Sequence, residues 1–420
     1  MVNYNILNHN VKRGILNFSK RICENLFRPE YKFVSQMIYG ILRSQSCHLS
    51  EIARALDETI SLKKTINRLS RDLHDFCDEG KLLENYINKI KRYISEKTIL
   101  IVDGSDVVKP NSPKMEYIRT VRDGSTGAYG EGYHTLGVTA LTPGKKMPIG
   151  VYTRVYSASE PGFISEDAEV LTALRFLSAH FNKNNIRAFD RGYDANIYFK
   201  YLLKHNELFV IRVNNNRNVL YKGETINILA LAKRFKGKYS LKFAKKNGFK
   251  ADCKISVVPV KLPCQSNEML NLVVCNGFGK EALLLITNIQ SDDNRLGVAV
   301  TKIYLLRWRI EEFYRFKKQQ FGFEDFRVRS LRSIRNLDLL LTIAIGYIGM
   351  MSDKVDERRL VMELIAISKR IRGTPRFIFY AIADGLFAVL ARCGQGIEEL
   401  VRKRKRSLQL DFLWEIGLAR

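Results

Sequence analysis

The spacing of apolar residues predicts helices over the first hundred residues of the chain. Apolar side chains recur at helical intervals in Leu49–Leu56 and again in Ser61–Leu73, where Ser61 is a typical N-cap residue. Two short helices with a tight turn between them are typical of a DNA-binding helix-turn-helix. An ordinary helical hairpin with a solvated basic face explains the same pattern, and both interpretations stay open. The basic residues of the second helix that would contact DNA are Lys63, Lys64 and Arg68.

From residue 98 onward the pattern changes to short strands. Ile99–Val102 is a continuous apolar run that ends in Asp103, as expected of a strand buried on both faces. The pattern then predicts strands at 134–141 and 148–155, a helix at 166–181, a strand at 186–189 followed by Asp190, a helix at 195–205 and a strand at 208–213. This order predicts an α/β sheet that begins with a meander, not a doubly wound nucleotide-binding fold.

The remaining zones are an insertion and a helical end. Residues 214–293 contain strand-like runs separated by turns rich in Gly, Asn and Lys, which predicts a mostly β insertion. A single long helix is predicted from Leu296 past Lys318, and the rest of the chain is helical, with a basic run at 402–406. The segment 110–132 is predicted to be a long functional loop. We therefore divide the chain into residues 1–96, 97–213, 214–295, 296–350 and 351–420.

Charge narrows the choice of partner. The 420 residues include 69 Lys and Arg against 43 Asp and Glu, a net charge of +26, which indicates an acidic partner such as nucleic acid or an anionic membrane. The apolar stretches 339–351 and 377–393 are too short or contain an acidic residue, so we expect buried core helices and no membrane span. The N-terminus has no apolar signal segment. We expect a cytoplasmic, nucleoid-associated protein with reduced cysteines.

Two aspartates are the first candidates for chemistry. Asp103 and Asp190 each close a buried strand, and if those strands are parallel neighbours their ends lie about 4.8 Å apart. Two carboxylates so close repel each other unless a proton or a metal ion neutralises them. Oxygen ligands suit Mg²⁺ or Mn²⁺. On its own the pattern is weak, because Asp commonly begins a turn.

The predicted long helix adds a third carboxylate and several cations. Tyr304, Arg307, Glu311 and Lys318 fall within a wedge of roughly 60° on that helix, and Arg315 lies near the same face. A carboxylate embedded among cations suits a metal-bound phosphodiester. The alternative is a solvated helix with salt bridges between residues four apart, although the many apolar neighbours argue against full exposure.

These motifs resemble a known family. The spacing Y-x2-R-x3-E-x6-K from Tyr304 to Lys318 is similar to the YREK signature of bacterial insertion-sequence DDE transposases of the type-four group, which includes the transposase of the kanamycin-resistance transposon. The segments RWRIEEFYRFKK, IVDGSD around Asp103 and FDRGYD around Asp190 also resemble that family. The three motifs occur in the family's order and span roughly residues 98–350.

The resemblance implies a fold, a catalytic triad and a reaction. It implies an α/β, ribonuclease H-like mixed sheet (97–213 and 296–350), a β-rich insertion (214–295), a helical DNA-binding region (1–96) and a helical C-terminal region suited to dimer contact (351–420). The implied triad is Asp103, Asp190 and Glu311, which would bind two Mg²⁺ ions, with Mn²⁺ as a substitute. Tyr304, Arg307 and Lys318 would contact DNA phosphates. The implied partners are transposon terminal inverted repeats, target DNA and a second copy of the chain, and the implied reaction is excision, through a hairpin at the transposon end, followed by strand transfer.

Three other functions fit parts of the sequence. A catalytically inactive, transposase-derived DNA-binding protein would keep the charge without needing the triad, yet all three carboxylates are present. A nuclease of the same fold would cut RNA or damaged DNA without specific ends. A tyrosine recombinase using Tyr304 would need histidine nearby, and the six histidines lie far from it in sequence.

Overall fold

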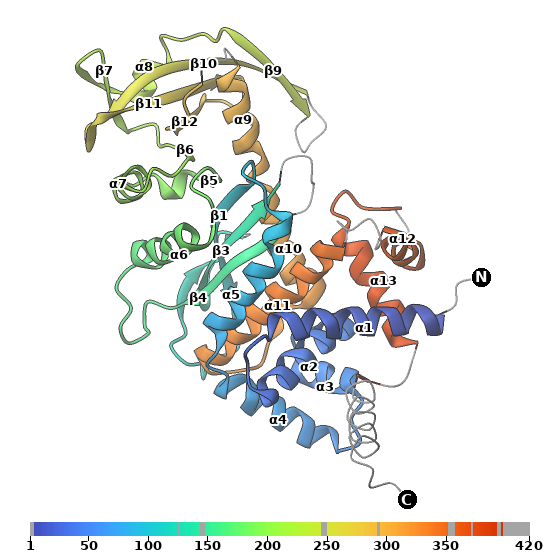
Figure 1. Cartoon of the computed structure of the whole chain (residues 1–420). Coiled ribbons are helices and arrows are strands. Elements are labelled where there is room, and N and C mark those ends of the chain that lie inside the picture. The colour runs from blue at the N-terminus through green and yellow to red at the C-terminus, as the bar shows by residue number, and fades with distance from the viewer. Residues whose placement is uncertain are drawn as a thin grey trace, which may run out of the picture.

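The computed structural model describes residues 4–124, 126–142, 148–244, 250–291, 295–351, 358–370, 373–392 and 396–397. A central group of strands separates α6 (Glu166–His180) and α7 (Asn196–Lys204) on the left of Figure 1 from α10 (Arg309–Phe321) and α11 (Leu331–Met351) on the right. The β-rich insertion lies at the top of this view, and most of the N-terminal helices lie in its lower part. The predicted basic run at 402–406 lies outside the described residues.

The N-terminal region is helical, as predicted. Its elements are α1 (Tyr4–Ile22), α2 (Arg28–Ser44), α3 (Leu49–Leu56), α4 (Leu62–Asp75), α5 (Glu79–Ile90) and a 3-10 turn (Lys91–Tyr93). The helices α3 and α4 coincide with the two predicted short helices. Ser61 is the N-cap residue of α4 in extended backbone, although its side chain makes no capping hydrogen bond.

The core sheet has the strand order of a ribonuclease H-like fold. Its elements are β1 (Ile99–Val108), β2 (Arg119–Arg122), β3 (Tyr129–Leu141), β4 (Ile149–Tyr156), α6 (Glu166–His180), β5 (Ile186–Phe189), a 3-10 turn (Arg191–Tyr193), α7 (Asn196–Lys204) and β6 (Phe209–Arg212). The strands β4, β3 and β1 form an antiparallel meander, whereas β5 and β6 continue the sheet parallel to β1. This confirms the predicted meander start and the predicted order of strands and helices.

Two local predictions in this region were wrong. Asp103 does not end its strand, because β1 continues to Val108 while it remains paired with β3. Only the parallel partner β5 stops at this level, where Val102 pairs with Phe189. The segment 110–132 is also less loop-like than predicted, because it contains β2 and the start of β3, which pair with each other.

The insertion is mostly β, as predicted, and it extends the same sheet. Its elements are β7 (Asn218–Tyr221), β8 (Glu224–Asn227), α8 (Ile228–Ala232), β9 (Tyr239–Ala244), β10 (Lys250–Leu262), β11 (Gln265–Asn276) and β12 (Leu283–Thr287). Because β12 pairs antiparallel with β6, the described strands form one continuous sheet. The insertion therefore starts where the core sheet would otherwise have an open edge.

The predicted long helix is broken in two. It consists of α9 (Leu296–Leu306) and α10 (Arg309–Phe321), with a turn at Arg307 and Trp308. Val300 of α9 lies in the apolar cluster of the insertion, Ile310 of α10 packs against the start of β1, and Ile303 of α9 contacts both clusters. The interruption is local: Arg307 and Trp308 keep helical dihedrals, and the Arg307 N–H bonds the Tyr304 carbonyl three residues back.

The C-terminal part is helical, with a short 3-10 turn (Phe323–Asp325) followed by α11 (Leu331–Met351), α12 (Arg358–Ile367) and α13 (Phe379–Ala391). The helix α11 is long and apolar enough to cross a membrane, but 94% of its most apolar window is buried inside the protein. It packs against β4 and the N-terminal helices. It is therefore a core helix, as predicted for 339–351.

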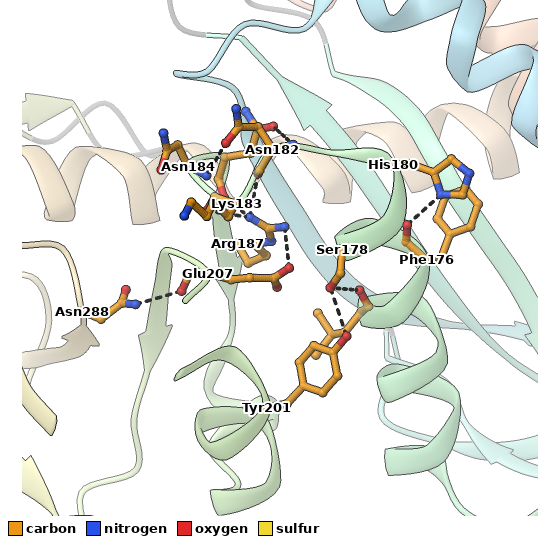
Figure 2. A network of polar contacts seen from close by, with 12 residues as sticks. Phe176, Ser178, His180, Asn182, Lys183, Asn184, Arg187, Tyr201, Glu207 and Asn288 are labelled. Carbon is orange, nitrogen blue, oxygen red and sulfur yellow. Dashed lines mark hydrogen bonds and ion pairs between the residues drawn. The ribbon is translucent and has the colours of Figure 1, made fainter. Parts of the chain in front are cut away.

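A buried ion pair fixes the N-terminal end of β5 (Figure 2). Arg187 is completely buried, and its Nη2 donates to Oε1 of Glu207 at 2.9 Å. Its Nη1 donates to the carbonyl oxygens of Asn182, Lys183 and Asn185. The carbonyl of Glu207 in turn accepts from the side chain of Asn288 at 2.8 Å. These contacts tie β5 to the segment before β6 and to the residue after β12.

Candidate active site

The two predicted aspartates lie side by side, directly after the last paired residues of two neighbouring parallel strands. The strands β1 and β5 pair in parallel with Val102 opposite Phe189, so Asp103 and Asp190 are the next residues on each. Residues 99–102 and 187–189 are buried, and an acidic, partly exposed residue follows on each strand. The predicted adjacency of the two strands is confirmed. Glu311 joins them from the first turn of α10.

The guanidinium of Arg307 lies at the centre of these three carboxylates. Its Nη1 donates to Oδ2 of Asp103 at 2.5 Å. Its Nη2 donates to Oε1 of Glu311 at 3.2 Å and lies 3.5 Å from Oδ2 of Asp190. The Arg307 side chain is 4% exposed, whereas those of Asp190 and Glu311 are 34% and 40% exposed. Acidic groups from three elements thus share one buried cation and remain open to solvent on their outer side.

Asp190 is also held from α9 and β6. The hydroxyl of Tyr304 donates to Oδ1 of Asp190 at 2.9 Å. Arg212, at the end of β6, places its Nη1 3.8 Å from the same oxygen and 3.5 Å from the Tyr304 hydroxyl. Tyr304 itself is 1% exposed. Its hydroxyl is therefore used within the protein to orient Asp190.

Asp103 is positioned by its backbone as well as by its side chain. Its Oδ1 accepts from the backbone N–H of Gly104 at 3.0 Å, and its carbonyl oxygen accepts from the hydroxyl of Tyr314 at 2.7 Å. Gly137 is the residue opposite Asp103 on β3, and a Cβ atom there would collide with the Tyr314 hydroxyl. The glycine lets α10 approach the sheet closely enough to reach Asp103.

Burial and charge set different pKa values for the two aspartates. Burial raises the pKa of Asp103 to about 7. The charge of Arg307 acts to lower this pKa, and the carboxylates of Asp190 and Glu311 act to raise it. Burial also acts to raise the pKa of Asp190, but Arg307, a backbone N–H and the Tyr304 hydroxyl outweigh it, and the pKa is lowered. Burial and the charge of Asp190 raise the pKa of Tyr304 to about 12, so this phenol remains a hydrogen-bond donor.

The donor set fits a divalent cation in its chemistry. Among the described residues, no three acidic, His or Cys side chains are arranged to hold a metal ion as they stand. The three carboxylates nevertheless converge on one positive charge, and they supply only hard oxygen ligands of the kind that Mg²⁺ and Mn²⁺ prefer. The cation that lies between them in this structure is the Arg307 guanidinium.

The other predicted residues of this region lie beside the cluster. The Nζ of Lys318 is 2.9 Å from Oε1 of Glu324 and 3.8 Å from Oδ2 of Asp106, a neighbour of Asp103 on β1. Arg315 pairs with Glu312, with 2.6 Å between Nη1 and Oε1. The predicted shared face is found for Tyr304, Arg307 and Glu311, which all reach the carboxylate cluster although the helix is interrupted at 307 and 308. The backbone of Arg307 and Trp308 keeps helical dihedrals, so the interruption does not turn Tyr304 away from α10.

The three residues of the N-terminal region that were predicted to contact DNA differ in their exposure: two are exposed and one is half-buried. Lys63 and Lys64 on α4 are exposed. Arg68 donates to both carboxylate oxygens of Glu58, at 2.9 and 2.8 Å, and to the side chain of Gln36 at 2.8 Å. Arg68 thus holds α4 against the preceding turn and α2. DNA contact by these three residues stays a prediction.

Sequence reasoning missed two residues that shape the site. Arg212 ends the parallel strand next to β5, so the same strand-end argument that found Asp190 could have indicated it. Tyr314 lies three residues after Glu311 on α10, and the sequence interpretation did not single it out. No local pattern marks Tyr314, because its role depends on its approach to Asp103 across the sheet.

Comparisons with known proteins place this geometry in a family. The transposase DDE domain family matches residues 94–346, more than half of the chain, and that range contains all three carboxylates. No curated protein matches the chain. Among solved structures, the chain is similar to the cryo-EM structure of the piggyBac transposase synaptic complex with hairpin DNA. The sequence identity is 10%, the TM-score is 0.46, and the match covers 93% of this chain and 82% of that one. On the strength of the family match, the chain belongs to the transposase DDE domain family.

Proposed function

We propose that the protein is a cut-and-paste transposase of the YREK group, which cleaves DNA at the ends of an insertion sequence and joins them to target DNA. The observation that carries the proposal is the convergence of Asp103, Asp190 and Glu311 on one cation, inside the matched transposase domain. The cluster joins the middle of β1, the end of β5 and the start of α10, and Asp190 and Glu311 are partly exposed to solvent. An extended substrate such as DNA can reach it there.

The three carboxylates would hold divalent cations, Mg²⁺ or its substitute Mn²⁺. When bound, such ions supply an activated attacking oxygen and stabilise the leaving oxygen of a phosphodiester. The chain's own residues hold the ligands in place: Tyr304 and Arg212 orient Asp190, and the backbone of Gly104 with the Tyr314 hydroxyl fixes Asp103. Orienting partners of this kind control how well carboxylates bind a metal.

Contact with DNA would rest on cations around the cluster. Lys318 offers a point charge, and Arg307 offers a planar fork that can grip a phosphate with two N–H groups. The DNA contact assigned to Tyr304 by the resemblance remains a prediction, since its hydroxyl bonds Asp190. Lys63, Lys64 and Arg68 would contact DNA at the transposon end, and Arg315 would add to the attractive field.

The partners would be double-stranded DNA carrying terminal inverted repeats, target DNA and a second copy of the chain. Two transposon ends need two active sites, so a homodimer on DNA is the natural assembly. The net charge of +26 supports attraction to DNA over the whole surface. The same proposal includes the division of the chain after residues 96, 213, 295 and 350. It also assigns dimer contact to residues 351–420.

The test is cleavage of a labelled duplex that carries the element's own terminal repeat. We expect cuts at the repeat end with Mg²⁺ and none with EDTA. Glu311→Gln should abolish them and keep DNA binding. The matched control is Glu312→Gln, one residue further along α10, where the carboxylate pairs with Arg315 and not with Arg307. Tight binding without cleavage under Mg²⁺ or Mn²⁺ would instead establish the inactive DNA-binding protein.

A further inference from the structure

The contacts of Arg307 differ from those expected of a residue that waits for a phosphate. Both terminal nitrogens of its guanidinium are engaged with carboxylates, and the side chain is almost completely buried. Asp103 lies 204 residues away in the sequence, so this arrangement is a tertiary feature and not a local helix salt bridge. A guanidinium that is 4% exposed and already faces three carboxylates offers a DNA phosphate little access in this arrangement.

The carboxylate oxygens of both aspartates are already in use. On Asp103, Oδ1 accepts from the Gly104 N–H and Oδ2 from Arg307. On Asp190, Oδ1 accepts from Tyr304 and Oδ2 lies against Arg307. A divalent cation that used these carboxylates would come within a few ångströms of the guanidinium, and two like charges at that separation repel strongly in a partly buried site.

The position of Arg307 allows it to leave. It lies in the turn between α9 and α10, and not within the regular part of either helix. The carboxylates of Asp190 and Glu311 are partly open to solvent, so a cation can reach them from outside. A rotation of the long Arg307 side chain away from the cluster would then exchange one positive charge for another.

We propose that Arg307 is the resident counter-ion of the catalytic carboxylates, that a divalent cation competes with it for them, and that metal entry releases its guanidinium toward the DNA phosphate. This inference rests on the proposed function, because it takes the three carboxylates as the metal ligands. Arg307, the arginine of the YREK signature, would then have two successive partners: the carboxylates first, and the DNA phosphate after the metal has entered. Metal binding and phosphate contact are then coupled through one side chain, as two ligands are coupled whenever each favours the same arrangement.

The experiment is a calorimetric titration of the full chain with Mn²⁺, with no DNA present. Arg307→Gln removes the competing charge and should bind Mn²⁺ about tenfold more tightly than the wild type, a typical size for coupling between two sites. Arg307→Lys keeps a charge but loses the fork, and should show a smaller gain. The matched control is Arg212→Gln, which removes a positive charge 3.8 Å from Asp190 but none from the centre of the cluster.

A second readout follows the side chain directly. Trp308 adjoins Arg307 and is 36% exposed, and the other tryptophan of the chain is Trp414. In a Trp414→Phe background, Mn²⁺ should change the fluorescence of Trp308, and the same addition to the Arg307→Gln variant should change it much less. Thermal unfolding of each variant, with and without Mn²⁺, checks that the comparison is made between folded proteins.

The outcomes separate this inference from the proposed function. Equal or weaker Mn²⁺ binding by Arg307→Gln would overturn the inference, and so would an equal gain in Arg212→Gln, which would point to general electrostatics. Mn²⁺ binding by Asp190→Asn tests separately whether the carboxylates are the metal ligands. If Asp190→Asn binds Mn²⁺ as well as the wild type does, the carboxylates are not the metal ligands, and the proposed function fails together with the inference.

Discussion

Two buried arginines lie near opposite ends of β5, and they have different surroundings: Arg187 belongs to the strand, and Arg307 comes from the turn between α9 and α10. Arg187 at the N-terminal end faces one carboxylate, Glu207, and three carbonyl oxygens, and both charged side chains are almost completely buried. Arg307 at the C-terminal end faces three carboxylates, two of which are partly exposed. In both arginines the buried Nε has no hydrogen-bond partner among the residues that the structure describes, so the difference lies in what surrounds the terminal nitrogens.

The difference separates a structural ion pair from a site. At Arg187 one carboxylate balances the one positive charge, and three carbonyl oxygens accept from Nη1, so the pair carries no excess charge that would attract a further ion. At Arg307 the acidic groups outnumber the guanidinium three to one, and Arg212 compensates only in part from 3.8 Å. Unbalanced negative charge that is held in place by hydrogen bonds is unfavourable in the resting fold and useful for binding a cation.

The largest effect should come from Glu311→Gln. It removes one negative charge from the unbalanced cluster, so DNA cleavage should fall to background while the free energy of unfolding changes by less than about 1 kcal/mol. Cleavage assays and urea unfolding of the same preparation measure both quantities. A large loss of stability in this variant would mean that the cluster at Arg307 is structural, like the pair at Arg187.

Glu207→Gln should do the reverse. It leaves Arg187 buried without a counter-charge, which typically costs about 3–5 kcal/mol of stability. Urea unfolding measures this loss, and the cleavage rate per folded molecule should stay close to that of the wild type. A stability loss below about 1 kcal/mol would mean that the carbonyl oxygens alone stabilise the buried charge of Arg187. The interpretation of Arg187 and Glu207 as a structural ion pair would then be wrong.

Asp103→Asn should change how stability depends on pH. The pKa of Asp103 is raised to about 7 in the folded chain, so the folded protein binds this proton more tightly than the unfolded chain does. The stability that it contributes is fully present below pH 4 and is lost as pH rises through 7, by up to about 1 kcal/mol per pH unit. Unfolding measured with EDTA from pH 4 to 8 should show this slope in the wild type and a flatter one in the variant. Equal slopes would contradict the raised pKa.

The smallest effect should come from Lys318→Ala. Lys318 lies next to the cluster, paired with Glu324, and would contact one phosphate. Its loss should weaken DNA binding uniformly across sequences and reduce the slope of log K against log salt by about one. Fluorescence anisotropy at several salt concentrations measures the slope. An unchanged slope would remove Lys318 from the DNA interface and leave it a structural link to Glu324 and Asp106.

Part of the site could be predicted because its signals are local. The apolar run 99–102 and the strand at 186–189 each mark a buried strand, and the acidic residue that follows each one marks where burial stops. The family motif supplied Glu311, which no strand pattern would have indicated. The break between α9 and α10 could not be predicted, because the helical periodicity of the apolar residues continues through it.

The sequence by itself determined the order of the elements, the meander start of the sheet, the β-rich insertion and the three acidic residues, because periodicity and chain order act over short distances. Only the tertiary structure decided which cation stands among the carboxylates. Arg307 meets Asp103 across 204 residues of chain, and Arg212 and Tyr304 meet Asp190 from two further elements. Charge interactions in a partly buried site depend on distance through space and on burial, and neither quantity is encoded in residue spacing.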